Sequence, residues 1–245
     1  MPQNNIQDWP GLTYAELRRE EERVLNRSDS VLNQGRLGTC GPIAVLHALE
    51  VESPTRLKAL ADEVYRDHAL LPADVVEGAN CERDRHPLAV ILATHLLNEN
   101  NLFLTYHATE SKADLVAGGS TSSDIKKWLE KFFPNREVSS YSSYFWGALN
   151  NAQKVSALWV SPEKKPIVVA LLNGDYLQAH AQNKHLPSLL AACSAKGHVI
   201  HILTPFIECL DGSIRFDAYT WGATQTFRMS KDDFKGMMWE LIVAQ

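Results

Sequence analysis

The 245-residue sequence lacks the features that mark most membrane proteins and nucleic-acid-binding proteins. It contains no run of lysine and arginine, and its formal net charge at pH 7 is −5, which disfavours polyanionic partners. No apolar run approaches the roughly 20 residues of a membrane-spanning helix. The N-terminal segment, MPQNNIQDWPG, is polar and lacks the apolar core of a signal peptide. We therefore expect neither a nucleic acid nor a membrane as a partner.

Cysteine is also scarce, and this limits the expected cofactors and compartment. The sequence has four cysteines, which are Cys40, Cys81, Cys193 and Cys209. They are too few and too scattered for a disulfide scaffold, and they lack the C-x-x-C spacing of a zinc or redox site. The sequence thus predicts a reduced, cytoplasmic protein with no metal ion and no other cofactor.

The residues that are present predict a globular protein whose first part is helical. Hydrophobic residues make up 45% and charged residues 22% of the chain, as in ordinary soluble domains. Residues 1–30 are expected to form a polar lead segment, and residues 31–245 the globular domain, either as one body or as two lobes. Apolar periodicity, N-cap candidates and prolines at helix starts predict helices at 13–25, 40–51, 54–71 and 86–100, and segment 118–133 is predicted to be a Gly/Ser loop that leads into a capped helix.

The later part of the domain has a different pattern, because short β-branched runs replace the helical periodicity. Strands are predicted at 166–172, 198–208 and 213–221. The segment CLDG, 209–212, predicts a hairpin turn between the last two strands, and NGDY, 173–176, predicts a plain turn after the first. Since helices precede strands along the chain, the sequence predicts an α+β fold.

Cys40 lies where the helix at 40–51 is expected to begin, and this position suits a nucleophile. The thiolate is the attacking form of cysteine, and the N-terminus of a helix favours negative charge. Gly38 permits a close backbone approach, and Pro42 has no N–H to leave unsatisfied in the first turn. The amide of Gln34 is a candidate oxyanion donor, together with the N–H of Cys40. For a cysteine considered alone, the alternative is a buried structural residue.

The segment QGRLGTCG, 34–41, resembles the active-site segment of the papain clan of cysteine proteases. Its sequence is most similar to the calpain form, Q-G-x-L-G-x-C, with matches at Gln34, Gly35, Leu37, Gly38 and Cys40. It departs from the family at Gly41, where papain and calpain usually carry tryptophan. The resemblance implies a papain-like fold, in which an N-terminal helical half with the nucleophile packs on a C-terminal antiparallel sheet with the histidine and the acid.

The resemblance also indicates which histidine is the general base. Papain-like proteins place the catalytic histidine far downstream, after a glycine at the start of a strand, and Lys196, Gly197 and His198 resemble the calpain sequence K-G-H. We therefore expect His198 to be the base and Gly197 to support its position. His201 is the alternative base. Three residues apart on a strand, the two histidines point to opposite faces, which also disfavours a metal site that uses both.

A third residue is expected to orient the histidine, close to Trp221 and Gly222. The asparagine that papain and calpain carry two positions before the tryptophan is replaced here by Tyr219. Asp217 lies two residues earlier on the same strand face, and aspartate fills this role in several bacterial papain-clan proteases. We expect Asp217 to fix the imidazole tautomer of His198 and to stabilise the imidazolium. Trp221 is expected to shield this pair from water.

Together these residues predict a cysteine endopeptidase that cleaves a protein substrate through Cys40, His198 and Asp217, with Gln34 in the oxyanion hole. The resemblance implies a bacterial effector or toxin protease, restrained by a cognate inhibitor or immunity protein. Such a protein acts in the cytoplasm or is delivered into a target cell without a classical signal peptide. Two alternatives remain, namely a papain-fold glutamine deamidase or transglutaminase, and a non-catalytic papain-like binding module.

Overall fold

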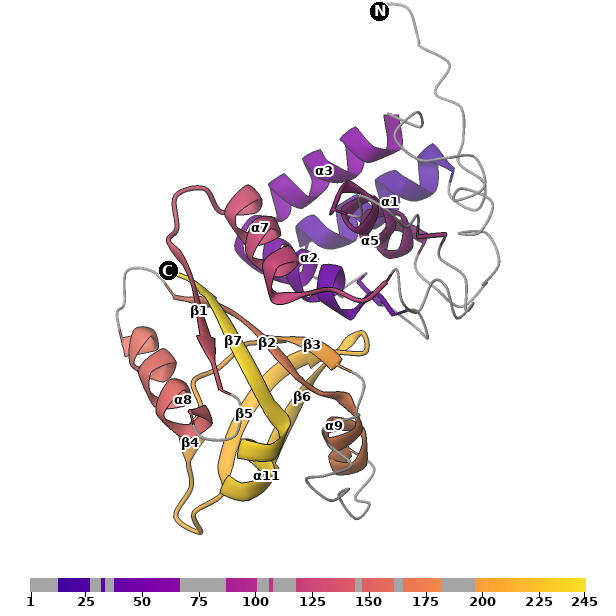
Figure 1. Ribbon diagram of the computed structural model, residues 1–245. Helices are drawn as coiled ribbons and strands as arrows, with labels where there is room; N and C mark the ends of the chain where they lie inside the picture. Colours follow the sequence, from indigo (N-terminus) through magenta and orange to yellow (C-terminus); the bar gives the residue numbers. More distant parts are fainter. Residues whose placement is uncertain are drawn as a thin grey trace, which may run out of the picture. The chain divides into compact units, whose positions relative to one another are not determined.

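The chain divides into two compact units, residues 1–120 and residues 121–245. The computed structural model describes residues 13–26, 32–33, 38–66, 87–100, 106–107, 118–143, 147–160, 165–181 and 197–245. Among these residues, the first unit is helical and contains α1 (Tyr14–Asn26), α2 (Cys40–Glu52), α3 (Pro54–Arg66) and α5 (Pro87–Asn100). The second unit holds the β-sheet with its own helices (Figure 1).

Helix α2 is the most deeply buried helix described in the first unit. Its sequence, CGPIAVLHALEVE, has no polar face, and every residue from Gly41 to Glu50 is buried, as expected for a helix that is apolar all round. It contacts α3 and α5, while α1 contacts α3. Among the described residues, no helix combines the length and the apolar character that crossing a membrane requires.

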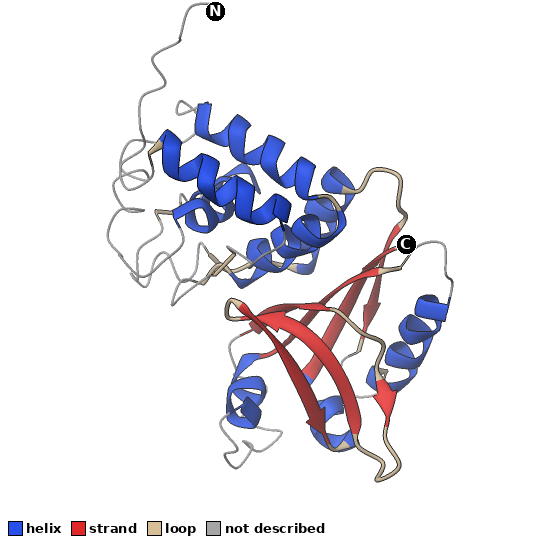
Figure 2. Cartoon of the chain, turned by 180° about the vertical axis from the view of Figure 1, so that it is seen from behind, coloured by secondary structure: helices blue, strands red, loops and turns tan. Residues whose placement is uncertain are grey.

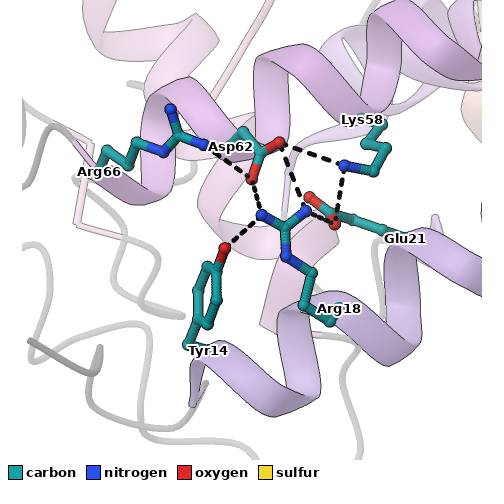
Figure 3. Close-up of polar contacts among 6 residues, drawn as sticks. All are labelled: Tyr14, Arg18, Glu21, Lys58, Asp62 and Arg66. Carbon is teal, nitrogen blue, oxygen red and sulfur yellow. Dashed lines mark hydrogen bonds and ion pairs between the residues drawn. The ribbon is translucent and has the colours of Figure 1, made fainter. Parts of the chain in front are cut away.

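Helices α1 and α3 are joined by charged side chains, which we call the α1–α3 ion cluster (Figure 3). It comprises Tyr14, Arg18, Glu21, Lys58, Asp62 and Arg66. The Arg18 guanidinium lies 2.9 Å from an Asp62 oxygen and also pairs with Glu21. Lys58 Nζ lies 3.4 Å from a Glu21 oxygen and 3.3 Å from an Asp62 oxygen. Helix α1, which falls within the expected polar lead segment, is therefore fastened to the rest of the first unit.

The second unit is built on a seven-stranded antiparallel sheet, in the order β1-β7-β2-β3-β5-β4, with β6 paired to β5. The sheet curls along its length (Figure 2). The strands are β1 (Val138–Ser142), β2 (Ile167–Asn173), β3 (Gly197–Ile202), β4 (Ile207–Glu208), β5 (Ile214–Thr220), β6 (Ala223–Met229) and β7 (Met238–Ala244). The helices are α7 (Ser122–Phe132), α8 (Ala148–Ala157), η2 (Leu158–Val160), α9 (Gly174–Ala181) and α11 (Lys231–Met237).

One face of this sheet carries the core of the second unit. Alternate residues of β2, β3, β5 and β7 pack there with buried side chains from α8, α9 and α11, because side chains on a strand alternate between the two faces. Leu172, Ile202 and Ala218 belong to this core. Residues of the opposite face, such as Val169 and His201, are also buried. Helix α7 contacts β1 and β7.

The predicted α+β class and the predicted helices are confirmed. Thr13 caps α1, since its Oγ1 accepts a hydrogen bond from Glu16 N–H at 3.2 Å while a Glu16 oxygen accepts one from Thr13 N–H at 2.8 Å, a capping box. Thr121 and Asp124 cap α7 in the same way. Prolines open α3 and α5 as expected. The predicted extension of α3 through residues 67–71 lies outside the described residues.

The predicted plain turn at NGDY is wrong, because these residues begin a helix. The Asn173 side-chain oxygen accepts hydrogen bonds from the N–H groups of Asp175, at 3.1 Å, and Tyr176, at 3.2 Å. Asparagine at such a position satisfies N–H groups that a helix start leaves free, and α9 follows. The predicted strand at 198–208 is interrupted and forms β3 and β4. The hairpin at CLDG is confirmed between β4 and β5.

Candidate active site

Cys40 is the first residue of α2 and its side chain is partly exposed. The Ile43 N–H donates to the Thr39 carbonyl at 3.1 Å, which closes the first turn. Pro42, two residues after Cys40, contributes no N–H. The thiol therefore lies at the positive end of a helix, where the unpaired backbone donors and the helix dipole favour a thiolate. Gln34, the predicted oxyanion donor, lies outside the described residues.

His198 is the second residue of β3, and its side chain is 8% exposed. Its Nε2 lies 2.8 Å from the Thr220 hydroxyl oxygen, at hydrogen-bonding distance. Gly197 precedes it, and a Cβ at that position would lie 3.2 Å from the Trp239 ring. A larger residue before the histidine would therefore crowd the Trp239 side chain, which would have to shift by a few tenths of an ångström.

The Trp221 ring stacks on the His198 imidazole, with ring centroids 5.0 Å apart and planes at 29°. Trp221 and Gly222 form the two-residue turn between β5 and β6, because Thr220 pairs with Ala223. Both turn residues have positive φ, 49° at Trp221 and 78° at Gly222, as tight hairpins of this kind require. A bulky side chain rarely adopts this conformation, so the turn holds Trp221 in a costly position against His198.

Burial lowers the pKa of His198 from its ordinary value of 6.5 to about 4, because an imidazolium is poorly solvated away from water. At neutral pH the ring is therefore uncharged and able to accept a proton. His201, the alternative base, lies on the opposite face of β3 and pairs across the sheet with Tyr219. Its burial lowers its pKa further, to about 3. The predicted opposite orientation of the two histidines agrees with the regular pairing of β3 to β2.

The structure does not bring Asp217 to His198. The register that pairs Ile202 with Ala218 places His198 and Thr220 on one face of the sheet and Asp217 on the other. The Asp217 carboxylate accepts a hydrogen bond from the Thr226 hydroxyl at 2.6 Å. The predicted contact between Asp217 and His198 is therefore wrong, because the strand register places the two side chains on opposite faces of the sheet. Thr220, which the sequence reasoning passed over, is the residue bonded to the imidazole.

The candidate residues are divided between the two units of the chain. Cys40 belongs to the first unit, whereas His198, Thr220 and Trp221 belong to the second. Cys209, in the hairpin between β4 and β5, is partly exposed, and like Cys40 it is not in a disulfide. Among the described residues, no group of three or more histidine, cysteine, aspartate or glutamate side chains is placed to hold a metal ion.

Comparisons with protein families, with curated proteins and with solved structures found no match to this chain. The chemistry assigned to it therefore rests on its own side chains. Two of them have features that catalysis uses, namely a thiol at a helix start and a buried, oriented imidazole.

Proposed function

We propose that the chain is a cysteine endopeptidase of the papain-like kind, with Cys40 as the nucleophile and His198 as the general base. The observation that carries this proposal is the setting of His198 at the start of β3. Its Nε2 is bonded to Thr220 and its ring is stacked on Trp221. Its Nδ1 has no hydrogen-bond partner among the residues that the structure describes. A buried imidazole with one nitrogen held and the other available has the form of a general base.

Two further features support the same proposal. Cys40 begins a helix that follows the segment QGRLGTCG, and the helical unit precedes the sheet unit along the chain. The order of nucleophile, histidine and Trp-Gly pair is the order expected from the resemblance to papain and calpain. The substrate class that follows is a peptide bond of a protein, and a papain-like fold is part of the proposal.

The reaction uses the neutral imidazole directly. The S–H bond of Cys40 breaks, its proton passes to His198, and the sulfur forms a bond to the substrate carbonyl carbon while the π electrons move to oxygen. Collapse of this oxyanion breaks the C–N bond, and the imidazolium gives its proton to the departing amine. Water then hydrolyses the thioester, releasing the acid and restoring the thiol. The Cys40 N–H and the Gln34 amide are the proposed oxyanion donors.

The decisive experiment compares proteomes treated with the wild-type protein and with Cys40→Ala. We expect new protein termini with the wild type and none with the variant, measured by mass spectrometry of labelled N-termini. The Cys209→Ala variant is the matched control, because it removes the other partly exposed thiol that the structure describes outside a disulfide, and it should cleave like the wild type. Mass gains at glutamine without new termini indicate a deamidase. An inert wild-type protein indicates a binding module, and both results contradict the proposal.

A second measurement tests whether His198 acts on Cys40. Iodoacetamide alkylation near neutral pH should be faster at Cys40 than at Cys209, because a thiol with a base beside it loses its proton more readily. His198→Gln should remove this difference while leaving the Cys209 rate unchanged. Equal rates at both cysteines in the wild type would show that Cys40 is not activated.

A further inference from the structure

The residue that holds His198 in place is a threonine, where the sequence favours an aspartate. We propose that Thr220 is the positioning residue of His198: its hydroxyl oxygen accepts a hydrogen bond from Nε2–H, which leaves Nδ1 to take the proton of Cys40. This inference rests on the proposed function and names a residue that acts through the base. The orienting group is then an uncharged hydroxyl in place of the expected carboxylate, and this difference changes how the Cys40 thiol is expected to ionise.

The contact is well placed to fix the ring. His198 Nε2 and Thr220 Oγ1 are 2.8 Å apart, and the two side chains are 8% and 3% exposed. A hydrogen bond with little access to water is stronger than one at the surface. Threonine is β-branched and has few rotamers, and Thr220 is the last residue of β5, next to the tight turn that holds Trp221. The hydroxyl and the stacked ring therefore constrain the imidazole from two directions.

The competing partner is excluded by geometry and by its own contacts. Asp217 lies on the opposite face of β5 from Thr220, since the two are three residues apart on a regular strand. Its carboxylate accepts from Thr226, and its backbone N–H donates to the Thr204 hydroxyl at 2.8 Å. Moving Asp217 to His198 would require a shift of β5 by one residue, which would turn the buried residues of this strand to the other face.

The hydrogen bond can be made by either imidazole tautomer with the roles reversed. If Nε2–H donates to Thr220, the lone pair lies at Nδ1, and the base is ready for a thiol. If the hydroxyl donates to Nε2, the proton lies at Nδ1, and that nitrogen has no lone pair with which to take the proton of Cys40. The proposed reaction requires the first arrangement, so the tautomer is a direct test of it.

An uncharged partner has a chemical consequence. A carboxylate stabilises an imidazolium, whereas a hydroxyl carries no charge. Among the residues that the structure describes, none adds a charge to the setting of His198: β2 presents Leu172 opposite it, and the β5–β6 turn presents Trp221. Burial accordingly lowers the histidine pKa without a compensating charge. The helix start favours a thiolate at Cys40, but no imidazolium is available to pair with it, so we expect Cys40 to be mainly a thiol that is deprotonated during attack. Its alkylation rate should rise with pH without a plateau in the acid range.

The first experiment reads the tautomer by ¹⁵N NMR of the His198 ring in the Cys40→Ala protein, which needs no activity. We expect a dominant Nε2–H tautomer, retained in Thr220→Ser and lost to a mixture in Thr220→Val, which has the same shape without the hydroxyl. Asp217→Asn is the matched control and should leave the ring signals unchanged. A dominant Nδ1–H tautomer, or a tautomer that changes with Asp217 and not with Thr220, overturns the proposal.

The second experiment follows Cys40 alkylation against pH in the protein with its thiol intact. Thr220→Val should slow alkylation at neutral pH by up to roughly tenfold, because it removes one hydrogen bond that orients the imidazole and leaves the base itself in place. Thr220→Asp should accelerate it in the acid range, because a carboxylate would stabilise the imidazolium. If the tautomer depends on Thr220 but alkylation is unaffected by His198→Gln, the proposed function fails and Thr220 is only a structural partner. If alkylation depends on His198 but not on Thr220, the proposed function stands and this inference is overturned.

Discussion

At the scale of single residues, the backbone conformation of Trp221 affects the pKa of the neighbouring His198. Its φ of 49° is in the left-handed region, which costs an ordinary residue roughly 1–2 kcal/mol. This conformation places the indole ring of Trp221 in a stack with the imidazole of His198. In Trp221→Gly the turn can keep its conformation while the cover is lost. We expect the pKa of His198 to rise from about 4 towards 6.5, measured by NMR titration of the Cys40→Ala protein.

Gly222 provides the control for this prediction. Its φ of 78° suits glycine, so Gly222→Ala should lower the free energy of unfolding by about 1 kcal/mol and leave Trp221 on the imidazole. The pKa of His198 should then stay low in this variant. A value that remains near 4 in Trp221→Gly as well would show that the strand and the core, and not the indole ring, exclude water from His198.

The site residues also show which parts of a site a sequence can predict. Cys40 and His198 are candidates chosen from local signals, and the structure bears out those signals: Cys40 begins a helix, and His198 follows the glycine that begins a strand. The partner of His198 could not be identified in this way. Alternation along β5 groups Asp217 with Tyr219, but only the register between β3 and β5 decides which group faces His198. Register depends on contacts far apart in the sequence.

At the scale of elements, the helices that were predicted are those with local start signals, whereas α8, α9 and α11 were not predicted as helices. Caps and prolines marked α1, α3, α5 and α7. Strand β7 was missed although it lies inside the sheet between β1 and β2. It follows α11 directly, with Met237 ending the helix and Met238 beginning the strand, so no glycine or proline separates the two. Its strand state depends on pairing with residues about 70 to 100 positions earlier.

The α1–α3 ion cluster makes a prediction about how these two helices are joined. Arg18, whose side chain is 33% exposed, bridges Glu21 of its own helix and Asp62 of α3. Arg18→Met keeps much of the apolar stem but leaves the buried Glu21 with Lys58 as its remaining cation. We expect the free energy of unfolding to fall by about 1–3 kcal/mol, measured by urea denaturation.

Arg19 is the matched control, because it is the next residue and has the same chemistry. Its side chain is 71% exposed and lies 3.9 Å from Glu16, a surface pair that contributes at most about 0.5 kcal/mol. Arg19→Met should therefore denature close to the wild type. Equal losses in Arg18→Met and Arg19→Met would mean that the cluster does not fasten α1 to α3.

At the scale of the whole molecule, the buried histidines predict how stability depends on pH. Burial lowers the pKa of His198 to about 4 and of His201 to about 3. Between these values and about 6.5, the unfolded chain binds protons that the folded chain does not bind. The free energy of unfolding must then fall as the pH falls below about 6.5. Glu21 acts in the opposite direction, because burial and the nearby Asp62 raise its pKa, so protonating it favours the folded state.

The test is a series of urea denaturations between about pH 7.5 and pH 5, for which we expect a loss on the order of 3 kcal/mol. His201→Gln should reduce the slope of stability against pH even if it lowers stability at every pH. The slope depends only on the difference between the numbers of protons bound by the unfolded and folded chains. His198→Gln should reduce it separately, since the two rings lie on opposite faces of β3. Glu21→Gln should steepen the loss, because it removes the opposing carboxyl. A slope that is the same in all four proteins would mean that neither histidine is held uncharged by the fold, and the neutral imidazole on which the proposed chemistry depends would have no support.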